Sequence, residues 1–208
     1  MDFYLLHSLS RNTWRWMKEL GVVELLEEAQ RRGRIRWFGF SFHDSFSAFE
    51  EILRARSWDL CQIQLNYLDW SFQNARAKVD LLKEHHIPVW VMEPLRGGKL
   101  ASLEDENAAV LKGLRPEEGI PAWAFRFLQS IPGVTMVLSG MSNFQQMQEN
   151  IAVFEEDKPL DEKEMAALLE VADRMVKKIA LPCSACHYCV SHCPKGLDIP
   201  GLLELYNE

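Results

Sequence analysis

The amino-acid sequence predicts an α/β protein in which parallel strands alternate with helices, followed by a short cysteine-rich tail. Five short apolar segments recur along the chain, and an amphipathic stretch follows each of them. The segments run almost without polar interruption, which is typical of parallel strands covered on both faces or closed into a barrel. A chain of 208 residues that is 48% hydrophobic and 25% charged can bury a sizeable core.

The predicted strands and helices follow one another in regular order. Strands are expected over residues 3–7, 35–41, 60–67, 88–94 and 135–141. Helices are expected over residues 14–32, 45–56, 72–86, 121–129 and 143–154. Residues 101–119 are expected to form a polar connecting segment. Gly33 follows the first helix, whose last turn is basic, and Pro121 opens the fourth helix. Both are usual helix boundaries.

A sixth helix is predicted over residues 161–179. Asp161 is a good N-cap and Glu164 stands at the third position, as in a capping box. Pro182 ends this helix and leads the chain into the cysteine-rich tail.

Five strand–helix units are too few to close an eightfold β/α barrel, which takes about 250 residues. The predicted fold is therefore a partial (β/α) TIM-type barrel with about five of the eight units. We expect an incomplete barrel over residues 1–158, a connecting helix over 159–182 and an iron–sulfur segment over 183–208.

The iron–sulfur prediction comes from four of the five cysteines, which follow the pattern C-x2-C-x2-C-x3-C-P at Cys183, Cys186, Cys189, Cys193 and Pro194. This is the spacing by which bacterial ferredoxins hold a 4Fe-4S cluster through thiolates. A zinc site that recruits His187 or His192 fits less well, since zinc ligands usually come as two separated pairs. Cys193 is favoured as the fourth ligand over Cys61, which lies in an apolar segment and reads as a small buried residue.

Charge and hydropathy exclude other classes of protein. The net charge of −7 argues against nucleic-acid binding, which uses clustered Lys and Arg. No apolar run is long enough to predict a membrane span, and the first residues lack the basic region of a signal peptide. Cysteines gathered in a cluster motif favour a reducing, cytoplasmic location.

Further motifs stand in a characteristic order along the chain. They are Asp2-Phe-Tyr-Leu-Leu-His7, Gly33-Arg-Ile-Arg-Trp-Phe-Gly-Phe-Ser41, Gln62-Ile-Gln-Leu-Asn66-Tyr67, Glu93-Pro-Leu-Arg-Gly-Gly98-Lys-Leu, Ser139-Gly140-Met-Ser142 and Glu149-Asn150. With the cysteine run, they resemble the aldo/keto reductase family, in particular bacterial members with a C-terminal ferredoxin-like segment. The resemblance covers essentially the whole chain. It implies an oxidoreductase that moves hydride between NAD(H) or NADP(H) and a small carbonyl or alcohol substrate, with an accessory 4Fe-4S cluster.

The resemblance also implies site residues. His7 would orient the substrate carbonyl, and Ser41 and Gln62 would hold the nicotinamide carboxamide. The cofactor phosphates and the adenine end would be bound by Ser139, Gly140, Ser142, Gln146, Glu149 and Asn150.

Three positions depart from the family pattern. The family's usual Ser-Asn pair appears here as Ser41-Phe42-His43, and Met92 stands where many members stack an aromatic ring on the nicotinamide. Gln146 stands where a cation would clamp the 2′-phosphate of NADP, so the choice between the two cofactors stays open.

The family's catalytic tyrosine, lysine and aspartate have no matching positions here, since the first three strand units would precede Met1. We therefore expect this chain alone to be weak or inactive as a carbonyl reductase. The alternative is an electron-transfer or binding subunit whose barrel is completed by another chain. A homo-oligomer that covers the open strands 3–7 and 135–141, or an electron-transfer protein, would be the partner.

Overall fold

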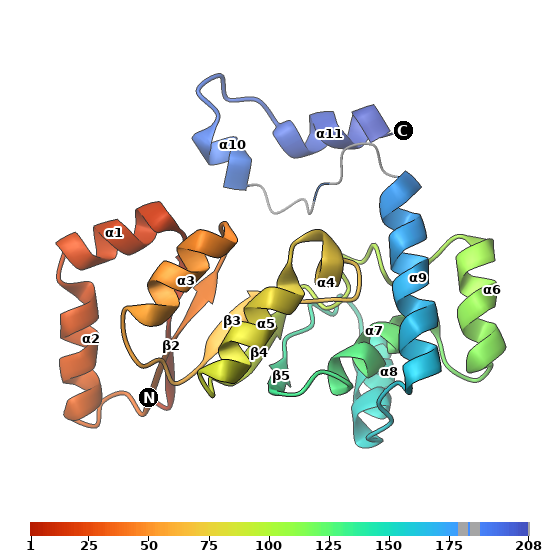
Figure 1. Ribbon diagram of the computed structural model, residues 1–208, viewed down its shortest axis with the longest axis horizontal. Coiled ribbons are helices and arrows are strands. Elements are labelled where there is room, and N and C mark those ends of the chain that lie inside the picture. Colours follow the sequence, from red (N-terminus) through yellow and green to blue (C-terminus); the bar gives the residue numbers. More distant parts are fainter. Residues whose placement is uncertain (179–182, 184–187, 208) are drawn as a thin grey trace.

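The computed structural model describes residues 1–178, 183 and 188–207, and its backbone forms one five-stranded sheet with surrounding helices (Figure 1). The strands are β1 (Phe3–Leu9), β2 (Trp37–Phe42), β3 (Cys61–Gln64), β4 (Val89–Met92) and β5 (Val134–Val137). They lie side by side in chain order, and each neighbouring pair is parallel. The predicted α/β class and parallel sheet are confirmed, and the sheet is consistent with part of a β/α barrel.

Helices connect the strands and continue beyond the sheet (Figure 1). They are α1 (Arg11–Glu19), α2 (Val22–Arg31), α3 (Phe46–Arg54), α4 (Asp69–Phe72), α5 (Ala75–Glu84), α6 (Asp105–Leu114), α7 (Ile120–Gln129), α8 (Phe144–Glu155), α9 (Glu162–Lys178), α10 (Tyr188–His192) and α11 (Ile199–Asn207). No helix in the described ranges is both long and apolar enough to cross a membrane.

Three helix predictions differ from the structure. The helix expected over residues 14–32 is split into α1 and α2 at Gly21, which has φ +67°. The helix expected over 72–86 is present as α5 but begins only at Ala75, after Asn74 with φ +53°. Glycine and asparagine tolerate this left-handed conformation, which ends a helix. The connecting segment over 101–119 contains α6, whose acidic first turn suits the positive end of the helix dipole.

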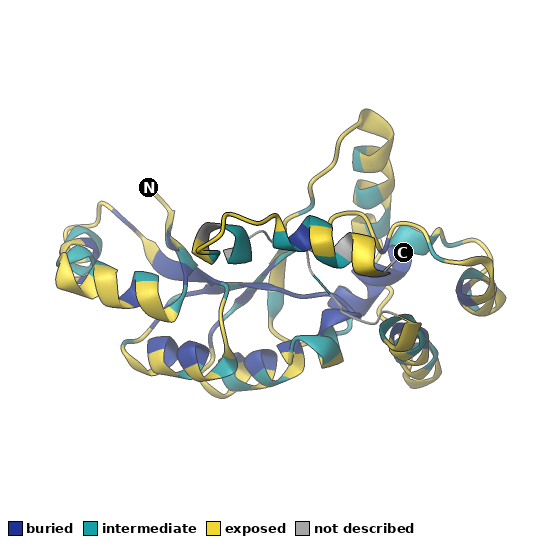
Figure 2. Cartoon of the chain, turned by 90° about the horizontal axis from the view of Figure 1, so that it is seen from above, coloured by how far each residue is buried: buried dark blue, intermediate teal, exposed yellow. Residues whose placement is uncertain are grey.

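Aromatic side chains join the sheet to α3. Phe40 and Phe42 lie with their ring centroids 6.2 and 5.0 Å from Phe49, and the ring of Trp58 lies 4.6 Å from that of Phe40 at a tilt of 55°. These side chains are buried. Figure 2 shows that buried residues gather along the strands and on helix sides turned toward them. Alternate residues of β2 therefore anchor the helical layer, while those between them point to the other face of the sheet.

The sheet is strongly curved. Phe3 of β1 and Trp90 of β4 have ring centroids only 4.9 Å apart, although two strands lie between their elements. A flat sheet would place them more than 10 Å apart, since neighbouring strands are spaced by about 4.8 Å. The concave face is not fully covered, because Phe3 and Trp37 remain 43% and 45% exposed.

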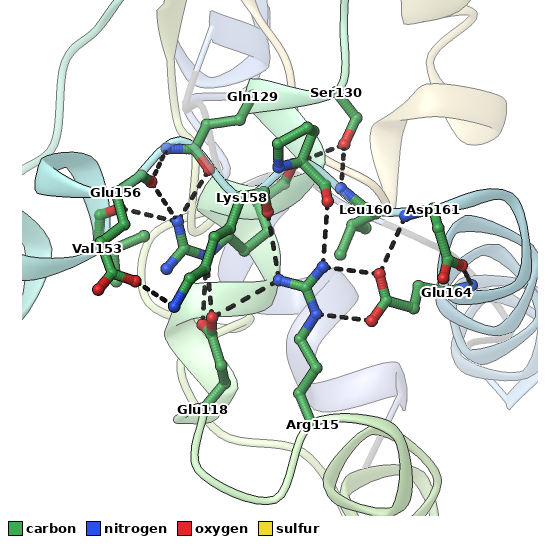
Figure 3. A network of polar contacts seen from close by, with 12 residues as sticks. Arg115, Glu118, Gln129, Ser130, Val153, Glu156, Lys158, Leu160, Asp161 and Glu164 are labelled. Atoms are coloured by element: carbon green, nitrogen blue, oxygen red, sulfur yellow. Dashed lines mark hydrogen bonds and ion pairs between the residues drawn. The ribbon is translucent and has the colours of Figure 1, made fainter.

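Ionic contacts attach α9 to the body of the protein (Figure 3). Arg115 donates two hydrogen bonds to Glu164, at 2.6 and 2.7 Å, and further bonds to the carbonyl groups of Lys158 and Pro159. The predicted capping box is confirmed, since the Glu164 amide donates to Asp161 Oδ1 at 2.8 Å. The Asp161 amide returns a bond of 2.9 Å to Glu164 Oε2.

Candidate functional site

A groove of about 740 Å³ lies at the carboxyl ends of β4 and β5. The loop after β4 forms one wall, and the loop after β5 with the first turns of α8 forms the other. Its lining includes six of the eight predicted cofactor residues, namely Ser139, Gly140, Ser142, Gln146, Glu149 and Asn150. Parallel α/β sheets commonly bind ligands at this edge.

The α8 wall is held by hydrogen bonds between side chains and backbone. Asn143 caps the helix by accepting from the Gln146 amide at 2.9 Å. Gln146 Oε1 in turn accepts from the Ser142 amide at 2.8 Å. Asn150 Nδ2 donates to Ser139 Oγ at 3.2 Å, which ties the helix to the loop that enters it.

The opposite wall contains two non-glycine residues in the left-handed region, Glu93 with φ +57° and Arg96 with φ +49°. Gly97 and Gly98 follow with positive φ, and the Gly97 amide donates to Glu93 Oε2 at 2.6 Å. Left-handed non-glycine residues cost roughly 1–3 kcal/mol each and persist only where their surroundings fix them. This loop was not predicted from the sequence as part of the site, although its Pro-Leu-Arg-Gly-Gly run is one of the motifs that resemble the family.

A buried polar cluster supports that loop from below. Asp69 Oδ2 accepts from Gln64 Nε2 at 2.7 Å and from Asn66 Nδ2 at 2.8 Å. Asn66 Nδ2 also donates to the carbonyl group of Glu93 at 3.0 Å. Arg96 Nε lies 3.2 Å from Asp69 Oδ1, and both side chains are almost fully buried. The Asp69–Arg96 contact lacks hydrogen-bond alignment, so it acts mainly through charge.

Ser41 and Gln62 lie outside the groove lining but next to each other. They are direct partners in the register of β2 and β3. Ser41 Oγ accepts from the Ser8 amide at 2.7 Å, while Gln62 Nε2 lies 3.5 Å from the sulfur of Met92. Since Met92 lines the groove, Gln62 links this strand pair to it.

His7, the predicted catalytic residue, is exposed near the end of β1 and lies outside the groove lining. A second histidine, His43, lies in its electrostatic field. Burial, then the charge of Lys78 and the neighbouring His7, lower the pKa of His43 from 6.5 to about 4. His43 is therefore neutral at pH 7 and can donate or accept a hydrogen bond. The sequence signalled this position only as a departure from the family pattern.

Of the tyrosines whose side chains the structure describes, none lines the groove. Tyr67 is buried, its hydroxyl has no hydrogen-bond partner among the described residues, and burial raises its pKa. Tyr4 and Tyr206 are exposed on β1 and α11. No tyrosine of the described part is therefore placed as a proton donor at the groove.

In the cysteine-rich tail, Cys183, Cys189 and Cys193 are described, whereas Cys186 lies outside the described residues. Within the described ranges, no three His, Cys, Asp or Glu side chains form a metal-binding group. The sulfur of Cys193 accepts from the Leu197 amide at 3.4 Å. Amides of Leu197, Lys195 and Gly196 lower the pKa of this thiol. Cys61 is fully buried in β3, which confirms it as a core residue.

Solved structures share this fold at low sequence identity. An aldo-keto reductase from Bacillus halodurans in its holo form matches with a TM-score of 0.67 and 21% identity, covering 82% of this chain and 58% of that one. An aldo-keto reductase from Klebsiella pneumoniae in complex with NADPH matches with a TM-score of 0.60 and 19% identity, covering 84% and 58%. A reductase of the same kind from Brucella melitensis gives 0.58 and 19%, covering 82% and 61%.

This chain thus spans about three fifths of the length of these neighbours. A search of curated protein sequences found no significant match. The sequence model described as "Aldo/keto reductase family" matches residues 1–173, which is most of the chain. The match of this model shows that the chain belongs to the aldo/keto reductase family.

Proposed function

We propose that this chain is the nicotinamide-binding part of an oxidoreductase that moves hydride between a nicotinamide cofactor and a small carbonyl or alcohol substrate. The observation that carries the proposal is the groove, whose lining includes the six predicted residues from the loop after β5 and α8. Membership of the family and the Klebsiella pneumoniae neighbour, which was solved with NADPH, support it.

The residues of the groove and of β3 fit such a cofactor. Ser139, Gly140 and Ser142 would face its phosphates, and Glu149 and Asn150 its adenosine end. The Gln62 amide is held only by contact with a thioether, a weak acceptor that a carboxamide oxygen would readily replace. Ser41 accepts the Ser8 amide and keeps its own proton for donation. When bound, the nicotinamide supplies or accepts the hydride.

His7 would orient the carbonyl oxygen of the substrate, with the neutral His43 beside it. Reduction also needs a positioned proton donor, which usually contributes about 10²–10⁴-fold. Since no described tyrosine stands at the groove, we expect this chain alone to bind the cofactor but reduce carbonyls slowly.

We further propose that Cys183, Cys186, Cys189 and Cys193 hold a 4Fe-4S cluster that exchanges electrons with a partner protein or serves structurally. Their spacing supports the cluster. Backbone N–H groups directed at the sulfur of Cys193 fit it too, since such bonds tune iron–sulfur centres. Cys193 is the fitting fourth ligand, because Cys61 is enclosed in the core of the sheet.

Two measurements on anaerobically prepared protein test these proposals. Titration with NADH, followed by nicotinamide fluorescence, should show saturable binding that Glu149→Ala weakens.

Analysis of iron and sulfide should find about four of each per chain. Cys189→Ser should abolish that content, whereas Cys61→Ala should keep it. Zinc in place of iron, or no metal, would refute the cluster, and absence of NADH binding would refute the hydride-transfer role.

One observation favours a second candidate, an electron-transfer or binding subunit completed by another chain. Among the residues that the structure describes, β1 and β5 each have one neighbouring strand in the sheet. Apolar side chains at these edges remain exposed, among them Phe3 and Met136. This candidate predicts a stable oligomer without affinity for NADH, whereas the first predicts cofactor binding in any oligomeric state.

A further inference from the structure

A second groove, of about 310 Å³, lies beside β5. All four residues of the strand line it, together with Leu128 and Gln129 of α7 and Phe154 of α8. Successive side chains of a strand point to opposite faces of the sheet, so a groove that touches all four residues lies along the edge of the strand. Its lining is mainly apolar, and it therefore offers a place for one further strand of apolar sequence.

Strand β1 of a second copy of the chain has the direction and the side chains for this place. The five strands are parallel and stand in chain order, so a β1 added beside β5 would continue the sheet in the same direction. β1 carries Phe3 and Tyr4, which are 43% and 37% exposed. Their burial against the groove would add hydrophobic contact at both edges of the sheet.

The loop beside the start of β1 is basic. Residues 31–36 contain four arginines and no acidic residue. The Met1 amino group donates to the Arg34 carbonyl group at 3.0 Å, and Arg36 lies 3.1 Å from Asp2, which places this loop at the amino end of β1. The other three arginines pair with carboxylates of their own chain, whereas Arg34 has no ion pair among the described residues.

The segment beside the start of β5 is acidic. Helix α8 ends at Glu155, and Glu156 and Asp157 follow it. Phe154 lines the groove together with β5, so this end of α8 lies next to the strand. Glu156 pairs with Lys158, whereas Glu155 and Asp157 have no ion pair in the described part of the chain.

The charges of the two edges complement each other. Parallel strands have their amino ends at the same side of a sheet, so pairing β1 with β5 brings the basic loop to the level of the acidic segment. Opposite charges across an interface favour association and set its orientation. Pairing of two β5 strands with each other would bring none of these arginines to the acidic segment.

The curvature of the sheet allows the same contact to form twice between two copies. Phe3 of β1 lies 4.9 Å from Trp90 of β4, so the sheet bends strongly toward its own far edge. A second copy that continues this bend returns its β5 toward β1 of the first copy. A contact between two different surfaces forms a ring where the rotation closes.

We propose that β5 of each copy takes β1 of a second copy as its next parallel strand, so that two chains form a closed dimer. Glu155 and Asp157 of each copy then face Arg34 of the other. The proposal goes beyond the nicotinamide-binding function and does not depend on it, because that function requires no particular oligomeric state.

Charge reversal at the two edges tests the contact by sedimentation velocity of the full chain at low salt, where exposed charges are least screened. The unmodified chain should form dimers at micromolar concentration. Arg34→Glu alone and Glu155→Lys alone should each raise the dissociation constant by about tenfold, since a closed dimer contains the altered contact twice. An equimolar mixture of the two variants should restore the dimer, because every contact then joins opposite charges.

Arg76→Glu is the matched control. Arg76 is exposed on α5, which follows the central strand β3, so the same charge is reversed away from both edge strands. This variant should dimerise like the unmodified chain, and mixing it with Glu155→Lys should leave the dissociation constant of Glu155→Lys unimproved. Thermal melting of each variant shows that a change in association does not come from unfolding.

Four results would overturn the proposal. A monomeric unmodified chain would show that the two edges do not pair. A dimer that Arg34→Glu leaves intact, or that the mixture of variants does not restore, would show that β5 meets a surface other than β1. Particles larger than a dimer would show that the contact does not close.

Discussion

The environment of His43 strongly disfavours the charged form of its imidazole. His43 follows β2, and its pKa is lowered to about 4, first by burial and then by the charges of Lys78 and His7. The unfolded chain binds a proton near pH 6.5, so below that pH it binds more protons than the folded chain. Above about pH 6.5, His43 therefore does not make the unfolding free energy depend on pH. As the pH falls from 6.5 toward 4, His43 lowers the unfolding free energy.

Replacing His43 by asparagine, which does not titrate, should remove this pH-dependent contribution to the unfolding free energy. When the pH is lowered from 7.5 to 5, the unfolding free energy of the unmodified chain should fall by about 1 kcal/mol more than that of His43→Asn. This figure allows for the partial exposure of His43. Urea unfolding at both pH values measures this difference. His85→Asn, at an exposed helix end, is the control and should follow the unmodified chain. Parallel pH curves for His43→Asn and the unmodified chain would contradict the role of burial.

Asp69 is the second residue with a strong consequence, because it holds the charge of Arg96 in the core. Asp69→Asn leaves Arg96 buried without its counter-charge, and the loss of one partner of a buried pair costs about 3 kcal/mol or more. Chemical unfolding should show this loss, and NADH affinity should fall, because the loop after β4 loses its support.

Asp80→Asn provides the comparison for this prediction. Asp80 pairs with Arg76 on the exposed side of α5, at 3.8 Å. Its removal should change the unfolding free energy by no more than about 0.5 kcal/mol. Equal effects of the two substitutions would show that the Asp69–Arg96 pair does not support the groove.

At the scale of elements, α9 depends on a small set of ionic contacts for its position (Figure 3). Hydrogen bonds from Arg115 lower the pKa of Glu164, so this carboxylate stabilises the fold above its usual pKa of 4.5. The contribution is lost as the pH falls below that value. Glu164→Gln should reduce the unfolding free energy at pH 7 by about 1–2 kcal/mol and flatten the acid limb of the stability curve.

Glu170 is the matched control on the same helix. It pairs with Arg174 at 2.9 Å, yet its side chain is 72% exposed. Glu170→Gln should therefore lie within about 0.5 kcal/mol of the unmodified chain. If both variants unfold alike, the attachment of α9 comes from its apolar face, which buries Leu168, Val171 and Ala172.

The strands could be predicted from the sequence because their apolar runs are continuous, and each observed strand overlaps its predicted segment. The helices were predicted less well where one backbone angle decides the outcome. Gly21 and Asn74 each interrupt an apolar periodicity that continues on both sides of them, so the pattern alone does not show the break. α6 was missed because its buried side is narrow, with only Asn107 and Leu111 buried.

The candidate site could be predicted where its residues lie close together in the sequence. The six residues predicted between Ser139 and Asn150 come from local motifs, and they line one groove. The contribution of Glu93, Gly97 and Gly98 depends on how β4 lies beside β5 and on the buried Asp69, which no local pattern shows. Long-range packing is thus what the sequence left undetermined.

At the scale of the whole molecule, the curved parallel sheet ends in β1 and β5, and neither has a second neighbouring strand in the described part of the chain. Edge strands present unpaired N–H and C=O groups, which favour association with another chain. The contact between Phe3 and Trp90 shows that β1 already bends toward the far side of the sheet. The exposed apolar residues on this face and at its edges, Phe3, Trp37 and Met136, add hydrophobic area that association would bury.

We therefore expect the chain to self-associate at micromolar concentration, and expect the edge of β5 to take part. Met136 is 41% exposed on β5, and a lysine there would place a charge beside the unpaired backbone groups. Met136→Lys should raise the monomer fraction in sedimentation velocity by several-fold. Leu25→Lys makes a similar change at a 67% exposed position of α2, outside the strands, and should leave the distribution unchanged. Equal shifts in both variants would attribute association to general surface hydrophobicity, and a monomer in every sample would show that the edges are protected without a partner.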